Sequence, residues 1–397
     1  MLLGGSRFLK PVIDSAHDLG YHVVTCDYLP NNSGHKLSDE YCNVSVIDRD
    51  AVLYAANKLG VQGIMSFATD PGVVTAAYVA EKLSLPTSPL KSVEILQSKD
   101  RFRYFLLDNG FRVPFFCVAS TVRDAQFSVA DQPYPMIIKP VDSAGSKGVV
   151  RLDSAVDIPP AFARALSQSR TGKVIIEQFL SPLNSPSDAD SLSIDGRLVF
   201  TSFTGQLFDR KAPNPFAPCV YTVPSEIPHV AQTHFVSELQ RMIHLLDMKS
   251  TLYNVETRVD NATKIPYFME VSPRGGGNRL SEMARLASGV DIIRAAVRAA
   301  VGLPPEALPT PATDSYIAEV VLHSNRDGRF DSVLVDPLIA DNNLIELDVW
   351  SQPGDSINAF SSAADAIGTA FFRFGSRDEM LDAVGAVDQW LHVNLTD

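Results

Sequence analysis

The chain has 397 residues and a mass of 43.2 kDa, about two to three times the length of a single domain, so we expect two or three packed lobes. A composition of 45% apolar and 20% charged residues excludes a disordered, collagen-like or coiled-coil protein, and no apolar run approaches the roughly 18 residues that a membrane span needs. The net charge of −12 argues against a nucleic-acid or membrane-surface binder, and four scattered cysteines without a Cys-x-x-Cys pair predict a cytoplasmic protein.

The first 88 residues alternate short apolar runs with helical patterns, as the βαβ units of a parallel sheet do. Two strands and two helices are predicted, over residues 23–26, 63–66, 50–59 and 73–82. Because the first strand begins at Met1, we expect this lobe to be slightly trimmed or its start site to differ. The Pro-Thr-Ser-Pro sequence that follows Leu85 ends the lobe.

A second lobe is predicted over residues 89–305, with a mobile lid at about 115–180. Before and within the lid we expect a helix over 98–109 and strands over 135–140, 149–152 and 173–179. Beyond the lid we expect a strand pair over 191–204, helices over 234–247 and 290–301, and a hairpin of strands 251–259 and 265–271. A Pro-rich stretch then leads into a C-terminal α+β lobe over 306–397, with a strand over 316–322 and a helix over 380–391.

Glu256 and Glu270 lie on the two strands of that hairpin, where they can face each other across the ladder. Two such carboxylates repel each other unless a divalent cation joins them, and Mg²⁺ prefers oxygen ligands. Arg274 follows before a glycine-rich run, and an arginine beside a metal pair can hold transferring phosphoryl oxygens. A solvated pair of exposed glutamates is the alternative, but the apolar flanks and the run of glycines favour a binding site.

Lys139 ends an apolar strand, where an ammonium group is costly unless it meets an anion. The Gly/Ser-rich loop of residues 143–148 follows, and its small residues leave backbone N–H groups open to phosphate oxygens. This loop lacks the spacing of a Walker A motif. A lysine that reaches the surface is the alternative; together, the lysine and the loop favour a phosphate site.

These features, in this order, resemble the ATP-grasp superfamily. The resemblance covers about residues 89–301 and rests on Lys99 before a helix, Ile-Ile-Lys-Pro at 137–140, the Gly/Ser loop, Val-Ile-Ile-Glu-Gln-Phe-Leu at 174–180, Glu256, and Glu-Val-Ser-Pro-Arg at 270–274. The first and last lobes resemble the pre-ATP-grasp domain and the C-terminal domain of the carboxylate–amine ligase branch. The implied fold class is α/β (α+β), an ATP-grasp fold with an N-terminal Rossmann-like domain and a small mixed C-terminal domain.

The resemblance also implies ATP and two Mg²⁺ ions, which Mn²⁺ could replace, and it implies roles for the matching residues. The implied nucleotide contacts are Lys99, Lys139, Ser143, Ser146, Lys147, Glu177, Gln178, Phe179 and Asp190, with Glu177 at the adenine amino group and Asp190 at the ribose. The implied metal ligands are Glu256, Glu270 and Ser272, and the implied catalytic residues are Lys139 and Arg274. The implied substrate contacts are Arg258, Gly275, Gly276, Gly277 and Asn278.

Two positions depart from the superfamily's pattern. Ser272 stands where an asparagine is usual, as it does in formate-dependent glycinamide ribonucleotide transformylases, and a hydroxyl is a weaker metal ligand than a carbonyl. The glycine that usually precedes the ribose-binding acid is replaced by Ser/Asp-rich sequence before Asp190.

The implied reaction is ADP-forming ligation, in which a carboxylate is activated as an acyl phosphate and then attacked by an amine. Small-molecule acid and amine partners are expected, amino acids first, and homodimers are frequent in the superfamily. A purine-pathway enzyme of the transformylase or carboxylase type is the alternative, suggested by Ser272-Pro273-Arg274. Arg210 and Lys211, on a Pro-rich loop, could also reach the cleft, or they could be solvated.

Two functions of other classes remain to be weighed. Gly4-Gly5 after a strand and Asp27 at the end of the next suggest a dinucleotide-dependent oxidoreductase, but the Gly-x-Gly-x-x-Gly motif is missing. A catalytically silent nucleotide sensor is disfavoured because the lysines, glutamates and arginine of the expected site are all present.

Overall fold

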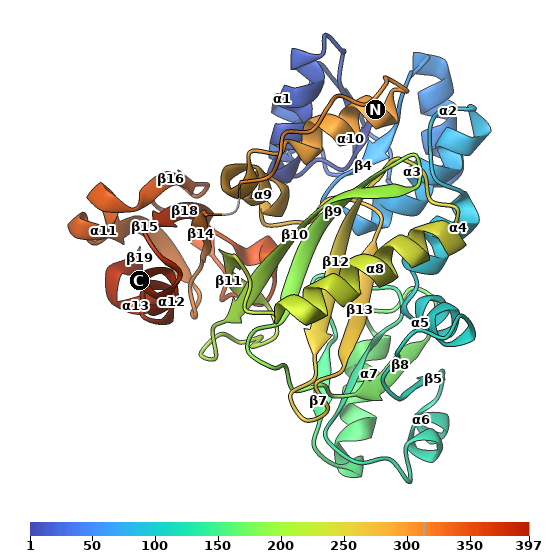
Figure 1. The fold of residues 1–397 in the computed structure, drawn as a ribbon, viewed down its shortest axis with the longest axis vertical. Helices are drawn as coiled ribbons and strands as arrows, with labels where there is room; N and C mark the ends of the chain where they lie inside the picture. The colour runs from blue at the N-terminus through green and yellow to red at the C-terminus, as the bar shows by residue number, and fades with distance from the viewer. Residues whose placement is uncertain (313, 397) are drawn as a thin grey trace.

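The first lobe of the computed structural model, which describes residues 1–312 and 314–396, is a small parallel sheet flanked by helices (Figure 1). Its strand order is β3 (Glu40–Cys42), β2 (Val24–Cys26), β1 (Leu2–Leu3) and β4 (Met65–Ser66), and its helices are α1 (Lys10–Asp18), α2 (Arg49–Leu59) and α3 (Asp70–Lys82). Asp48 caps α2 by accepting from the backbone N of Ala51 at 3.0 Å, and α2 ends at Gly60, whose φ is 62°.

The lid is a four-stranded antiparallel sheet covered by two helices. Its strands are β5 (Phe116–Ala119), β6 (Met136–Pro140), β7 (Val150–Leu152) and β8 (Val174–Gln178), and its helices are α6 (Val122–Ser128) and α7 (Ile158–Leu166). Helices α4 (Leu90–Leu96) and α5 (Lys99–Asp108) connect the lid to the first lobe. Met136, Ile138 and Ile176 are fully buried under the two lid helices, so the lid has a core of its own.

An eight-stranded sheet forms the centre of the molecule, with the order β13-β12-β9-β10-β11-β14-β18-β16. The first five of these strands are β13 (Pro266–Ser272), β12 (Thr251–Val259), β9 (Ser187–Ile194), β10 (Arg197–Phe208) and β11 (Pro218–Val223). Helix α8 (His229–Leu245) lies along one face of the sheet, while α9 (Leu280–Ser288) and α10 (Ile292–Ala300) lie toward the first lobe (Figure 1). Buried residues of α1 and α10 share one apolar cluster, which fixes the first lobe against the centre.

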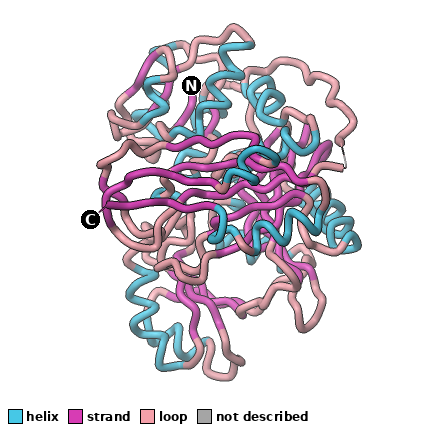
Figure 2. The backbone as a smooth tube through the Cα atoms, turned by 90° about the vertical axis from the view of Figure 1, so that its left-hand side faces the viewer, coloured by secondary structure: helices cyan, strands magenta, loops and turns pink. Residues whose placement is uncertain are grey.

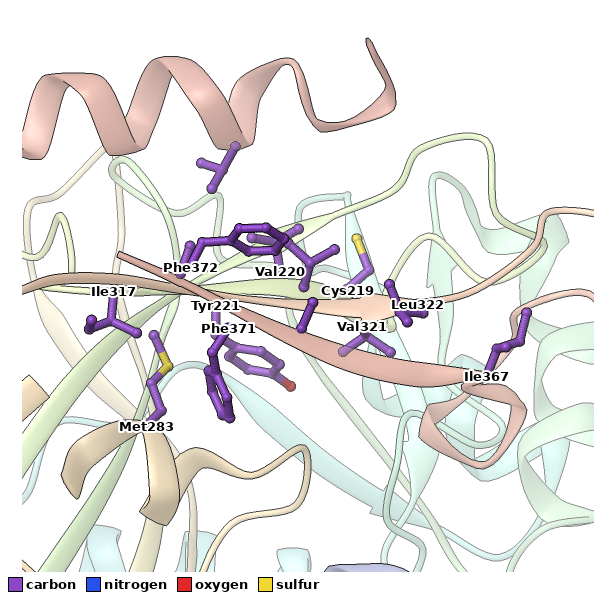
Figure 3. Close-up of a cluster of buried hydrophobic side chains, with 14 of the residues drawn as sticks. Cys219, Val220, Tyr221, Met283, Ile317, Val321, Leu322, Ile367, Phe371 and Phe372 are labelled. Carbon is purple, nitrogen blue, oxygen red and sulfur yellow. The ribbon is translucent and has the colours of Figure 1, made fainter. Parts of the chain in front are cut away.

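The C-terminal lobe adds three strands to the central sheet and a small sheet of its own. Its elements are β14 (Tyr316–Leu322), β15 (Gly328–Val335), α11 (Pro337–Asn342), β16 (Leu344–Val349), β17 (Ser356–Ile357), β18 (Gly368–Phe374), α12 (Arg377–Gly385), α13 (Val387–Trp390) and β19 (Leu391–Thr396). Seen from this lobe, the first lobe lies above its strands and the lid below them (Figure 2). Figure 3 shows Phe372 and Phe371 packing on opposite faces of β18, as neighbouring strand residues do.

The fold class predicted from the sequence is confirmed, and most elements lie within a few residues of their predicted bounds. The single helix predicted over 380–391 is wrong: α12 ends at Gly385, α13 is a separate short helix, and Leu391 begins β19. Helix α3 begins three residues early, at Asp70, because Pro71 can occupy the first turn of a helix. Helix α8 begins five residues early, at His229, directly after a proline. The sequence did not reveal that β14, β16 and β18 would join the central sheet. No helix in the described ranges is long and apolar enough to cross a membrane.

Candidate active site

A cavity of about 290 Å³ lies where the lobes and the lid meet the central sheet. Phe8 and Asp70 line it from the first lobe, Lys139 from the lid, Glu270 from β13 and Ala363 from the C-terminal lobe. A more open cleft of about 580 Å³ lies beside this cavity. The two share Asp70, Ser143 and Glu270 in their walls, so they form one continuous space. Every lobe therefore contributes to a single candidate site.

Most of the site residues predicted from the sequence line this cavity. They are Lys99, Lys139, Ser143, Ser146, Lys147, Gln178, Phe179, Glu256, Arg258, Glu270, Arg274, Gly277 and Asn278. The fold brings them together from the lid, α5, β12, β13 and the turn before α9, which are far apart in the sequence.

Glu256 and Glu270 are direct partners across the β12–β13 ladder, as the hairpin predicted. Each is balanced by a cation: Lys99 Nζ lies 3.1 Å from a Glu270 carboxylate oxygen, and Arg258 Nη2 lies 3.3 Å from Glu256 Oε1. Burial would lower the pKa of Lys99, but the nearby Glu270 outweighs it and raises that pKa. The described residues hold no group of three or more His, Cys, Asp or Glu side chains able to bind a metal, so the protein offers two carboxylates here.

Arg274 is bound to the first lobe through a bidentate ion pair with Asp70. Arg274 Nε donates to Asp70 Oδ1 at 3.0 Å and Nη2 donates to Oδ2 at 2.7 Å, and Asp70 stands at the start of α3. Burial would raise the pKa of Asp70, but Arg274 outweighs it and lowers that pKa. A planar guanidinium held at both ends has little rotational freedom, so Asp70 fixes the position of Arg274 in the cavity.

The Gly/Ser loop between β6 and β7 is held on both sides of the cavity. Lys99 Nζ donates to the backbone O of Ser143 at 2.8 Å, and Ser146 Oγ donates to the backbone O of Phe216 at 3.0 Å. The backbone of Gly145, Ser146 and Gly148 has positive φ values of 66°, 58° and 73°. Such a turn directs N–H groups into a concave surface, which suits an anion.

Comparison with known proteins places part of this arrangement in a family. Residues 132–282, which include the Gly/Ser loop, both glutamates and Arg274, match the model of the ATP-grasp domain. This part of the chain is therefore similar to ATP-grasp domains. The domain model thus covers β6, β7, α7 and β8 of the lid and the five strands of the central sheet that carry cavity residues.

The chain is also similar to proteins with different substrates. Formate-dependent phosphoribosylglycinamide formyltransferase of Burkholderia mallei (strain SAVP1) is 30% identical over 188 residues, which cover 45% of this chain and 46% of that protein. The alignment thus spans about half the length of the relative. Among solved structures, the L-amino acid ligase from Bacillus licheniformis matches with a TM-score of 0.79 and 19% sequence identity. Phosphoribosylglycinamide synthetase from Anaerococcus prevotii matches with a TM-score of 0.77 and 16% sequence identity. Each match covers 100% of this chain and 98% of the other chain. These structures share the overall fold of this chain over its whole length.

Glu177 does not face the cavity of the ATP-grasp domain, although the resemblance placed it at the adenine amino group. Its carboxylate is fully buried, with Arg103 Nε at 2.5 Å from Oε1 and Lys139 Nζ at 2.6 Å from Oε2. Burial would raise the pKa of Glu177, but the two cations outweigh it and lower that pKa to about 2. Its oxygens are committed to this ion triad, while its neighbours Gln178 and Phe179 do line the cavity.

Ser272, expected from the resemblance to be a metal ligand, does not itself line the cavity, and its hydroxyl contacts Asp70, which does. Its hydroxyl donates to Asp70 Oδ1 at 2.7 Å and accepts from Gln97 Nε2 at 2.5 Å, and the residue is 1% exposed. The hydroxyl of Ser272 therefore helps to hold the Asp70 carboxylate that pairs with Arg274.

Asp190 is buried behind the cavity wall, so the structure does not support its expected contact with the ribose. Its carboxylate accepts from the backbone N of Gly276 at 3.0 Å and from Ser281 Oγ. Gly276 is occupied by this bond, and Gly275 packs against the ring of Phe67, so neither glycine lines the cavity. Of the predicted glycine run, Gly277 and Asn278 remain as cavity residues, and Asn278 Nδ2 donates to the hydroxyl of Tyr221 at 2.9 Å.

Five polar residues of the cavity were not predicted from the sequence, namely Asp70, Asp188, Gln206, Tyr221 and Asn254. Asp188 lies two residues before Asp190 on the same strand, and a period of two could have identified it. Asp70 follows the carboxyl end of β4, where ligand sites in parallel sheets are common. Tyr221 and Asn254 gave no local signal, because only the strand order brings them to the cavity.

Arg210 and Lys211 lie outside the cavity, although the sequence left open that they reach the cleft. Both are exposed, and Lys211 Nζ pairs with Asp388 at 3.1 Å on the C-terminal lobe. We expect the double substitution of Arg210 and Lys211 to Ala to leave the KM of every substrate unchanged, because exposed ion pairs contribute about 0–1 kcal/mol at most. Steady-state kinetics measure this, and a several-fold rise in one KM would return the two residues to the site.

Proposed function

We propose that this chain is an ATP-dependent ligase that activates a small carboxylate as an acyl phosphate and joins it to an amine, with release of ADP and phosphate. The observation that supports this most directly is the convergence of Glu256, Glu270, Lys99, Lys139 and Arg274 on one cavity under the Gly/Ser loop. Phosphoryl transfer from ATP requires neutralisation of phosphate charge and in-line positioning, and these residues can supply both.

Two carboxylates side by side in a polar cavity fit Mg²⁺, which keeps several water and phosphate ligands and needs few from the protein. Glu256 and Glu270 would hold the metal, and Lys99, now 3.1 Å from Glu270, would be free to turn to a phosphate oxygen. Bound Mg²⁺ would neutralise phosphate charge. We expect ATP and Mg²⁺ at this site, with two ions as the finer proposal.

The protein's own residues can position the nucleotide. Lys139 reaches the cavity from β6 while its counter-ion Glu177 holds its ammonium group in place. The Gly/Ser loop, with Lys147 exposed at its tip, can close over the phosphates and keep water from the transferring group. Arg274, fixed by Asp70, faces the same space and can bind the oxygens of the phosphoryl group in transfer.

The chemistry has two steps. A carboxylate oxygen of the acid attacks the γ-phosphorus of ATP, the bond to the β-phosphate oxygen breaks, and its electron pair leaves with ADP. The amine nitrogen then attacks the acyl carbon, and the bond from that carbon to the phosphate oxygen breaks as phosphate leaves. An ammonium substrate loses one proton before this attack and a second as the amide forms, so the protons pass to phosphate and to solvent. No covalent intermediate with the protein is needed.

The far end of the cavity favours a small acid or amino acid over a ribonucleotide. The residues that β10 and β11 contribute there are Gln206, Phe208, Pro218 and Tyr221, and none of them is positively charged. A phosphate-bearing substrate needs Arg or Lys at its phosphate. The similarity to the formyltransferase of Burkholderia mallei keeps a purine-type reaction as the second candidate, with the arginine-containing open cleft as the place for a phosphate.

The test measures ADP, AMP and phosphate released from MgATP while pools of amino acids, small carboxylates and amines are offered singly and in pairs. We expect ADP and phosphate only when an acid and an amine are present together. AMP and pyrophosphate would overturn the acyl-phosphate mechanism. Turnover only with a phosphoribosyl amine and formate or bicarbonate would replace the first candidate with the second.

A further inference from the structure

Asp188 occupies the middle of the cavity wall, between the glutamate pair and the aromatic end. It lies on β9, where its backbone pairs with Glu256 of β12 on one side and with Thr204 of β10 on the other. Its carboxylate faces the cavity and is fixed by two amides: Asn254 Nδ2 donates to Oδ1 at 2.6 Å, and Gln206 Nε2 donates to Oδ2 at 3.4 Å. The side chain is therefore held in one orientation.

Asp188 differs from the other acids of the cavity because no cation among the described residues contacts it, although the charge of Arg274 acts on it from farther away. Asp70 is paired with Arg274 at 2.7 Å, Glu270 with Lys99 at 3.1 Å and Glu256 with Arg258 at 3.3 Å. In the described part of the chain no Lys, Arg or His nitrogen forms an ion pair with Asp188. A half-buried carboxylate beside two other acids is costly unless a positive group balances it.

A metal ion is a poor match for this position. The described side chains do not bring Asp188, Glu256 and Glu270 close enough to act as one metal-binding group. On the side of β10 and β11 the cavity is lined by Gln206, which contacts Asp188, by Tyr221, which is near enough for the charge of Asp188 to raise its pKa, and farther along β10 by Phe208. Aromatic rings beside a carboxylate suit an organic ammonium group, whose alkyl part can pack on the rings while its charge meets the acid.

We propose that Asp188 binds the positively charged amine of the substrate pair. The inference deepens the proposed ligase function and rests on it, because it assigns a residue to the nucleophile that the acyl phosphate needs. Asp188 is two strands away from Glu270, so an amine held there would approach from the side of β10 and β11. Arg274 and the metal pair would be left to the acid and the phosphates.

The test compares Asp188→Asn with wild type, and uses Asp195→Asn as the matched control. Asp195 lies in the turn of the same hairpin, is exposed, and accepts only a long bond from Ser250 Oγ at 3.2 Å. The probes are the standard amino acids and their desamino carboxylic acids. Each is added with Mg²⁺ and a non-hydrolysable ATP analogue. Titration calorimetry measures each dissociation constant.

We expect at least one amino compound to bind wild type and Asp195→Asn alike, and to bind Asp188→Asn about 10- to 100-fold more weakly, because one charge-assisted hydrogen bond is lost. Binding of the desamino acids and of the nucleotide should be unchanged. Asp188→Glu should restore part of the affinity. In turnover, the KM for the amine should rise more than the KM for the acid.

Three results would overturn the inference. Equal affinity of the amino compounds for wild type and Asp188→Asn would remove Asp188 from the amine site, and binding of no amine to the nucleotide-bound wild type would do the same. A raised Mg²⁺ requirement in Asp188→Asn with unchanged amine affinity would assign the residue to a metal. Failure of wild type to bind MgATP would instead refute the proposed function itself, so the two failures are distinguishable.

Discussion

Replacing Glu270 with Gln should lower the rate of ADP release at least about 100-fold, because a single charged group at a phosphoryl-transfer site is worth about 10²–10³ in rate. Glu270 faces Glu256 across the ladder and is paired with Lys99. The amide is a weaker Mg²⁺ ligand than the carboxylate, and its loss of charge also leaves Lys99 to compete with the metal for phosphate oxygens. A coupled assay of ADP at saturating MgATP measures the rate.

Glu238→Gln on α8 is the matched control, because Glu238 pairs only with Arg241 on the surface of the helix at 2.9 Å. That variant should keep wild-type activity. Glu270→Gln must also keep its thermal midpoint near that of wild type for the rate to be interpreted. A folded Glu270→Gln protein that turns over ATP at the wild-type rate would refute the assignment of the metal pair.

Replacing Glu177 with Gln should destabilise the protein by about 3–5 kcal/mol, the usual cost of removing one partner from a buried ion pair. Glu177 is 0% exposed and lies between Arg103 and Lys139, and Arg103 also donates to the backbone O of Met269 at 2.9 Å. The triad thus joins α5, the lid sheet and β13. Without the carboxylate, two buried cations face each other unbalanced. Urea unfolding measures the change in free energy.

The stabilisation by Glu177 should depend on pH in a defined window. Its pKa in the folded protein is about 2, below the ordinary value of 4.5. A carboxylate with a lowered folded pKa stabilises the protein above its unfolded pKa and loses this contribution as the pH falls. The difference in stability between wild type and Glu177→Gln should therefore be full above pH 4.5 and shrink as the pH falls toward 2.

Glu306→Gln is the control for this second experiment, because Glu306 also pairs with two arginines but on the surface. It lies 2.9 Å from Arg294 and 2.8 Å from Arg298 and is 46% exposed at its side chain. Solvated pairs of this kind are worth about 0–1 kcal/mol, so the control should change little. If Glu177→Gln were no less stable than Glu306→Gln, the triad would not be what holds α5, the lid sheet and β13 together.

Local sequence patterns predicted the elements and much of the site because they rest on interactions between near neighbours. Apolar periodicity located β14 at its exact bounds, from Tyr316 to Leu322. The fourteen-residue separation of Glu256 and Glu270, read as one hairpin, predicted their pairing across the ladder. The Gly/Ser loop and Lys139 were placed at the cavity for the same reason, since each sits at the end of a strand.

The partners of each charged residue could not be read from the sequence. The motif around Glu177 predicted a contact with the nucleotide. In the structure Arg103, 74 residues away in the sequence, donates to the Glu177 carboxylate in the core. Asp70 and Arg274 are 204 residues apart and pair only because the first lobe packs on the central sheet. Asp190 was predicted as a site residue and Asp188 was not, although both lie on one face of β9. The sequence does not show which of the two side chains other segments bury and which one faces the cavity.

The sequence by itself determined the class of fold, the order of the lobes and the residue types that gather at the candidate site, because strand periodicity, turns and motif spacing are local properties of the chain. The tertiary structure alone decided which acidic side chains face the cavity and which form ion pairs in the core. Desolvation and counter-ion distance set the state of a carboxylate, and both are fixed by segments far apart in the sequence.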